Sequence, residues 1–149
     1  MEKALRADDI TGYFGTGEQD LRSYSPLGLA FVGDAVYSLI VRTITIEQGN
    51  TKVEKLHLRV SDYARASYQS ALAAAIYELL DEEETDVYKR GRNARSHAAP
   101  KNASTGDYHR ATGLEALIGY LYLAGREERI MELMKKGMQL LKEKEDGIQ

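Results

Sequence analysis

Apolar residues recur at helical spacing through most of this sequence, and no convincing strand pattern of alternating apolar and polar residues is present. The clearest helix is predicted from Pro26 to about residue 47, because Ser25 is a favoured N-cap and proline fits the first helical position. Gly49 and Asn50 then provide a stop signal. The same spacing predicts further helices over residues 52–62, 64–80, 108–124 and 127–143. The pattern therefore predicts an all-α fold.

Two segments lack this periodicity. Residues 91–107 are rich in Arg, Asn, Ala, Ser and Gly and include Pro100, so they predict a long loop, which in compact domains is usually functional or disordered. Residues 1–24 have mixed composition and support only a weak helix prediction. The length of 149 residues suits one domain. We therefore expect an N-terminal extension of uncertain structure over residues 1–24 and one helical domain over residues 25–149.

Composition limits the location and the chemistry. The chain contains no cysteine, which excludes disulfides, thiolate zinc sites and a cysteine nucleophile. No apolar stretch approaches the roughly 20 residues needed to cross a bilayer, because Gly33 and Asp34 interrupt the longest one. The N-terminus has no apolar segment behind a basic start, so it does not read as a secretory signal. We expect a cytoplasmic protein with no membrane partner.

Charge is distributed unevenly along the chain. The net charge is −3, yet residues 89–110 hold six cations and one carboxylate, a local charge of +5. Such a basic island in an acidic chain favours a polyanion-binding surface, although a solvated basic loop would have the same composition. Just before the island, Asp81 can cap a helix whose positive end the run Glu82–Glu84 complements, so we expect this acidic cluster to be structural.

Two acids stand in otherwise apolar helical runs, Asp34 within residues 27–41 and Glu115 within residues 111–123. A buried carboxylate needs a cation, a metal or a proton, since burying it unpaired costs several kcal/mol. Gly113 and Gly119 flank Glu115 and would let helix 26–47 approach closely, which would bring the two acids together. Hard oxygen ligands suit Mg²⁺ or Mn²⁺. The alternative is that each acid pairs with a nearby Arg or Lys.

Other reactive patterns are absent from the sequence. The three histidines lack metal-ligand spacing, and no glycine-rich nucleotide-binding motif or nucleophile-elbow serine occurs. The acid pair is therefore the leading candidate for chemistry.

Several motifs carry a family resemblance. Leu29-Ala-Phe-Val-Gly-Asp-Ala-Val36 resembles the signature segment of ribonuclease III catalytic domains, and Leu114-Glu-Ala-Leu-Ile-Gly-Tyr-Leu121 resembles their second acidic helix. Lys89-Arg-Gly-Arg-Asn-Ala-Arg-Ser96, followed by Pro100-Lys-Asn102, is similar to the Mini-III ribonucleases in particular. The motifs occur in the same order, over roughly residues 25–143, and leave residues 1–24 outside the resemblance.

The resemblance implies a ribonuclease III-type helical endonuclease domain that acts as a homodimer. It implies hydrolysis of double-stranded RNA with Mg²⁺, or Mn²⁺ as a substitute, to 5′-phosphate and 3′-hydroxyl ends. Asp34 and Glu115 match the catalytic, metal-binding acids, and Thr112 is a possible ligand through water. Two further acids of the larger family are replaced here by Ala30 and Thr112, a reduced set that Mini-III proteins share. The chain also ends too soon after Glu115 to hold the separate double-stranded-RNA-binding domain of larger relatives.

The resemblance implies that the substrate is precursor ribosomal RNA, in particular that of the large subunit, and that a ribosomal protein is a possible partner. An A-form duplex is recognised mostly through shape, phosphates and 2′-hydroxyls, which requires cations and hydrogen-bond donors. Two alternatives stay open: a catalytically silent helical module that binds RNA or the ribosome, and a helical interaction protein with no RNA role. The candidate RNA-binding residues are Arg90, Arg92, Asn93, Arg95, Lys101, Asn102, Lys52, Lys55 and Arg59.

Overall fold

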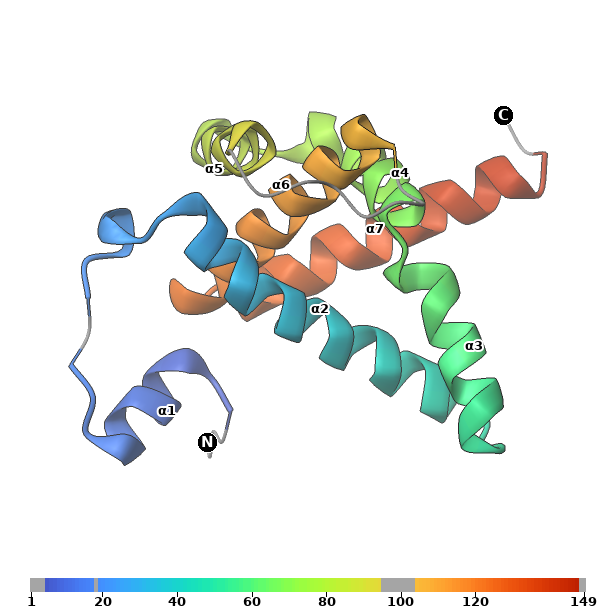
Figure 1. Ribbon diagram of the computed structural model, residues 1–149, viewed down its shortest axis with the longest axis horizontal. Coiled ribbons are helices and arrows are strands. Elements are labelled where there is room, and N and C mark those ends of the chain that lie inside the picture. The colour runs from blue at the N-terminus through green and yellow to red at the C-terminus, as the bar shows by residue number, and fades with distance from the viewer. Residues whose placement is uncertain (1–4, 18, 95–103, 148–149) are drawn as a thin grey trace.

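A computed structural model describes residues 5–17, 19–94 and 104–147, and these residues form helices and no strands (Figure 1). The predicted all-α class is confirmed. Two short 3₁₀ helices, Leu21–Ser23 and Tyr77–Leu79, accompany the α-helices. The α-helices are α1 (Ala7–Phe14), α2 (Pro26–Glu47), α3 (Val53–Ala64), α4 (Ala66–Ile76), α5 (Glu82–Asn93), α6 (Thr105–Leu123) and α7 (Glu127–Glu145).

The observed helix ends agree with the predicted ones where the sequence contains a clear capping residue. Helix α2 spans the predicted residues, and the Ser25 hydroxyl accepts a hydrogen bond from the Gly28 amide at 3.0 Å. The predicted loop over residues 91–107 was too long, because α5 continues to Asn93 and α6 already begins at Thr105. Ser104 caps α6 by accepting a hydrogen bond from the Asp107 amide at 3.0 Å. The first turn of α6 is polar and has no apolar periodicity, so the sequence pattern did not predict that the helix begins there.

Helix α6 is the centre of the fold, and α2, α4, α5 and α7 pack around it (Figure 1). Its interior positions are buried on nearly every side, which is the property of a central core helix. The largest fully buried side chains come from α2, α4, α5 and α6 and are Tyr37, Leu29, Leu72, Leu114, Leu117, Leu121, Glu84, Val41 and Thr45.

Helix α2 corrects one expectation from the sequence. Helix α2 is 22 residues long and contains an 18-residue window with a mean hydropathy of 1.6, so by length and composition alone it could cross a membrane. A single glycine and a single acid do not lower the mean enough to prevent this. Core helices of soluble proteins pass the same test, and α2 packs along α6 in this fold.

The acidic cluster before the basic island is structural, as predicted. Asp81 and Glu84 form a reciprocal capping box at the start of α5. The Glu84 side chain is 0% exposed and accepts hydrogen bonds from Arg129 of α7 at 2.8 and 2.9 Å. The hydrogen bond from Arg129 holds the pKa of Glu84 below its usual value despite burial. This buried ion pair fastens α5 to α7.

The N-terminal segment is attached to the junction of α6 and α7. Arg6 Nε lies 3.3 Å from Glu127 Oε1, and the Tyr122 hydroxyl donates to the Leu5 carbonyl. The division into an extension over 1–24 and a domain over 25–149 stays a prediction.

Candidate active site

Helices α2 and α6 cross at two facing glycines. A Cβ atom on Gly33 would lie 1.7 Å from the Glu115 carbonyl oxygen, and a Cβ on Gly119 would lie 1.9 Å from that of Leu29. Only glycine allows backbones to meet so closely. Gly113, in contrast, faces Tyr88 of α5, so of the two glycines that flank Glu115 it is Gly119 that admits α2.

This crossing brings Asp34 and Glu115 together. Glu115 is half-buried, and its side chain is near enough to Asp34 to donate a hydrogen bond to it when protonated. Burial raises the pKa of Glu115 to about 8, and both the charge of Asp34 and that hydrogen bond add to the rise. Two carboxylates from helices far apart in the sequence thus lie side by side. Their mutual repulsion favours the binding of a proton or a cation between them.

Asp34 itself is exposed, contrary to the expectation of burial. The face of α2 that packs in the core carries Ala30, Gly33, Tyr37 and Val41, and Asp34 lies just beside it. The apolar residues around Asp34 do not bury it within one chain because several of them are exposed as well.

No lysine or arginine in the described ranges forms an ion pair with Asp34 or Glu115. The pairing with a nearby cation that the sequence left open is therefore not found in that part of the chain. No group of three or more His, Asp or Glu side chains gathers there either. A site of two carboxylates with no basic partner fits a cation such as Mg²⁺, which keeps several waters and takes one or two protein carboxylates.

Two neighbours of the acid pair escaped sequence analysis. Tyr37 is 2% exposed, and its hydroxyl donates to the Tyr63 carbonyl at 2.6 Å. Burial raises its pKa, and Tyr68 and Glu115 add to the rise. Gln69 of α4 is 5% exposed, and a hydrogen bond from it opposes the rise in the pKa of Glu115. The sequence did contain a signal for Gln69, since it stands in helical register with the apolar residues Leu72, Ala73 and Ile76.

Thr112, the possible ligand through water, is 8% exposed. Its hydroxyl donates to the Tyr108 carbonyl one turn earlier, at 3.0 Å. The proton of this hydroxyl is therefore engaged, and only its lone pairs can accept a hydrogen bond from a water.

The candidate RNA-binding residues fall into separate groups. Lys52, Lys55 and Arg59 are exposed at or on α3, whereas Arg90 and Asn93 are exposed on α5. These two helices lie at opposite ends of the molecule, so one chain does not join the groups into a single patch (Figure 1). Arg92 donates through Nε to Asn93 Oδ1 at 3.2 Å, and its guanidinium lies 5.8 Å from the centre of the Tyr88 ring. Arg95, Lys101 and Asn102 lie outside the described residues.

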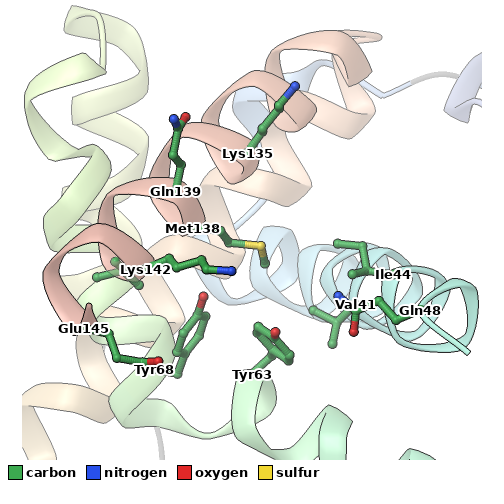
Figure 2. Close-up of a pocket in the computed structure, with 11 residues that line it drawn as sticks. Val41, Ile44, Gln48, Tyr63, Tyr68, Lys135, Met138, Gln139, Lys142 and Glu145 are labelled. Atoms are coloured by element: carbon green, nitrogen blue, oxygen red, sulfur yellow. The ribbon is translucent and has the colours of Figure 1, made fainter. Parts of the chain in front are cut away.

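A cavity of about 570 Å³ lies between α2, α7 and the side chains of Tyr63 and Tyr68 (Figure 2). Lys135, Lys142 and Glu145 line its α7 side. Neither acid of the pair lines it, so it is distinct from the candidate active site.

Comparison with known proteins agrees with this geometry. Residues 27–126 match the family described as the Ribonuclease III domain. The chain is 46% identical to Mini-ribonuclease 3 of Clostridium tetani over 96% of this chain and 91% of that protein. It is 45% identical to Mini-ribonuclease 3 of Thermoanaerobacter sp. (strain X514) over 85% of this chain and 89% of that protein.

A solved structure is similar as well. The chain superimposes on a crystal structure of a Fusobacterium nucleatum protein with a TM-score of 0.73 and 36% identity, over 79% of this chain and 96% of that one. Sequence and fold therefore agree, and this chain belongs to the ribonuclease III family and is an endoribonuclease.

Proposed function

We propose that this endoribonuclease hydrolyses phosphodiester bonds of double-stranded RNA at a divalent cation held by Asp34 and Glu115. The observation that carries the proposal is the convergence of these two acids at a glycine crossing with no basic partner in the described residues. The family relation supports the chemistry, since ribonuclease III enzymes act on double-stranded RNA and generally depend on divalent metals.

In this proposal each acid has its own part. Asp34 is exposed and would bind the cation, Mg²⁺ with Mn²⁺ as a substitute, on the side from which RNA arrives. Glu115 is half-buried and would release its proton as it binds, because its raised pKa leaves it protonated in the cation-free protein at neutral pH. A divalent cation held by these two acids would supply an acidified water and would neutralise charge on the phosphate oxygens. Thr112 would orient a water through its lone pairs.

We assign RNA binding to the exposed cations on both sides of the acid pair. Lys52, Lys55 and Arg59 would contact phosphates from α3, and Arg90 would do so from α5 together with Arg92 and Asn93. Arg95, Lys101 and Asn102 extend this set beyond the described residues. Contacts of this kind follow the backbone of an A-form duplex and read its shape.

We further propose a homodimer joined along the outer face of α2. Phe31 is 81% exposed and Leu39 is 59% exposed, and both lie on the same side of the helix as the less exposed Leu27 and Ile46. Asp34 stands one turn after Phe31, so this interface would border the acid pair. A two-fold axis there would place two sites on opposite strands of one duplex.

The biological setting is also part of the proposal. We assign the catalytic domain to residues 25–149 and treat 1–24 as an attached extension. The natural substrate is precursor RNA of the large ribosomal subunit, cut in the cytoplasm to 5′-phosphate and 3′-hydroxyl ends. A ribosomal protein is the partner to test. The similarity to Mini-ribonuclease 3 proteins supports the ribonuclease activity on which this setting rests.

The test is cleavage of an end-labelled RNA duplex, with its single strand as comparison, over a range of Mg²⁺ concentrations. Wild type should cut only the duplex and only with the cation, and Asp34→Asn and Glu115→Gln should each lose at least 100-fold in rate, the scale of a disrupted catalytic geometry. Glu78→Gln, which changes an exposed acid away from the pair, is the control and should cut normally. Duplex binding without cutting by wild type, across divalent metals, would instead indicate the silent RNA-binding module.

A further inference from the structure

We infer that Gln69 is a positioning residue of the acid pair, which holds the Glu115 carboxylate through Nε2 and offers Oε1 to the water shell of a hydrated divalent cation. This inference rests on the proposed function, because it assumes that Asp34 and Glu115 bind such a cation. The arrangement joins the end of α3, the start of α4 and the middle of α6.

Gln69 is buried near the start of α4. It is 5% exposed and stands on the face of α4 that carries Leu72, Ala73 and Ile76 into the core. Burying an amide in such a place is unfavourable unless its polar atoms are hydrogen-bonded. A leucine at this position would continue the apolar face at no such cost. The amide therefore needs a reason to be there.

A backbone carbonyl fixes the orientation of the Gln69 amide. Nε2 donates to the Ala64 carbonyl at 3.0 Å, which only the nitrogen end of the amide can do. The amide nitrogen carries two hydrogens, and Gln69 also forms a side-chain hydrogen bond that favours the charged form of Glu115. Gln69 thus ties the carboxylate that must ionise to a fixed backbone carbonyl.

Gln69 Oε1 is buried and has no hydrogen-bond partner within the described part of the chain. It shares its amide carbon with Nε2, so a hydrogen bond of about 3 Å from Nε2 to the Glu115 carboxylate puts Oε1 roughly 5 Å from that carboxylate. An unsatisfied buried acceptor in a native protein calls for an explanation such as a bound water or ion. Hydrated Mg²⁺ and Mn²⁺ ions keep bound waters, and such a water can donate a hydrogen bond to Oε1. Polar groups that orient the ligands of a metal ion commonly form hydrogen bonds of this kind.

The test measures binding of Mn²⁺ to the full chain without RNA, by the electron paramagnetic resonance signal of the free ion. Gln69→Leu and Gln69→Met should bind Mn²⁺ about 10-fold more weakly than wild type, the lower end of the range for residues that orient metal ligands. The Mg²⁺ concentration for half-maximal duplex cleavage should rise by the same factor. Thr45→Val is the control, because Thr45 is a buried polar residue of α2 outside the site, and it should leave both values unchanged.

The outcomes separate the inference from the proposal beneath it. If both Gln69 variants bind Mn²⁺ within twofold of wild type, while Asp34→Asn and Glu115→Gln abolish binding, the inference about Gln69 is overturned and the acid site stands. If the two acid variants also bind normally, the proposed function itself fails. Loss of helical circular dichroism in both Gln69 variants would make Gln69 a purely structural residue and would equally overturn the inference.

Discussion

Gly33→Ala should separate the two helices that bring the acids together. The added Cβ would lie 1.7 Å from the Glu115 carbonyl oxygen and 2.7 Å from its carbonyl carbon, whereas an ordinary contact begins at 3.4 Å. The backbone of α6 must therefore move by about 1.7 Å or α2 must shift by a similar amount. Neither partner is a flexible side chain, so the displacement falls on the pair Asp34 and Glu115 themselves.

The expected effects on stability and on activity differ in size. Alanine favours a helix by about 1 kcal/mol over glycine, but overpacking typically costs about 1–3 kcal/mol, so we expect a net loss of about 0–2 kcal/mol in the free energy of unfolding. Activity should fall much further, by about 100-fold, since a displacement of 1 Å at a catalytic centre can cost that much. Chemical denaturation measures the first quantity, and single-turnover cleavage of a duplex measures the second.

Gly12→Ala is the matched control for this variant. Gly12 lies within α1, and a Cβ there would have nothing within 4 Å. This control should be as stable as wild type or slightly more stable, with unchanged cleavage. Full activity of a folded Gly33→Ala protein would refute the reasoning that this crossing sets the geometry of the acid pair.

Three further predictions concern other parts of the molecule. Glu84→Gln should lose about 3 kcal/mol in the free energy of unfolding at pH 7, because it leaves Arg129 without its buried charged partner. The pKa of Glu84 is lowered from 4.5 in the folded protein, so the ion pair stabilises the fold above pH 4.5. The difference in unfolding free energy between wild type and variant, measured in urea, should therefore shrink as the pH falls below that value. A gap that stays constant down to pH 3 would contradict this assignment. Phe31→Asp should convert a dimer to a monomer in sedimentation equilibrium, because the phenyl ring is 81% exposed on the proposed interface, and a variant that sediments as wild type would argue against that interface. Asp34→Asn should remove the rise in melting temperature that 10 mM Mg²⁺, on the order of a saturating concentration, gives wild type at neutral pH by binding the folded state; an unchanged rise with Mg²⁺ would place the cation elsewhere. Without the cation, this variant should melt above wild type only above about pH 8, where Glu115 ionises beside Asp34.

Most of the helices could be predicted from the sequence because capping residues mark their ends. Ser25 and Pro26 fix the start of α2, and Asp81, which was expected as a cap, fixes the start of α5, where the structure adds a capping box with Glu84. The start of α6 was missed because its cap, Ser104, stands in a polar segment where several serines and asparagines look alike. Local chemistry decides such boundaries, and periodicity alone does not find them.

The candidate site was only partly predictable for a different reason. The two glycine-containing helices could be matched by their small residues, and the crossing at Gly33 and Gly119 bears out that expectation. The exposure of Asp34 could not be foreseen, because apolar neighbours such as Phe31 face away from the core and do not cover it. The position of Gln69 depends on the turn between α3 and α4, which sets where the Ala64 carbonyl lies. No single helix carries that information.

The most direct test of the central proposal is a crystal of the protein soaked in Mn²⁺ and measured for anomalous scattering. We expect an anomalous peak in contact with carboxylate oxygens of both Asp34 and Glu115, and we expect it to be lost in crystals of Glu115→Gln. A strong peak held by other residues, with none between these two acids, would contradict the claim that they form the metal site of this ribonuclease.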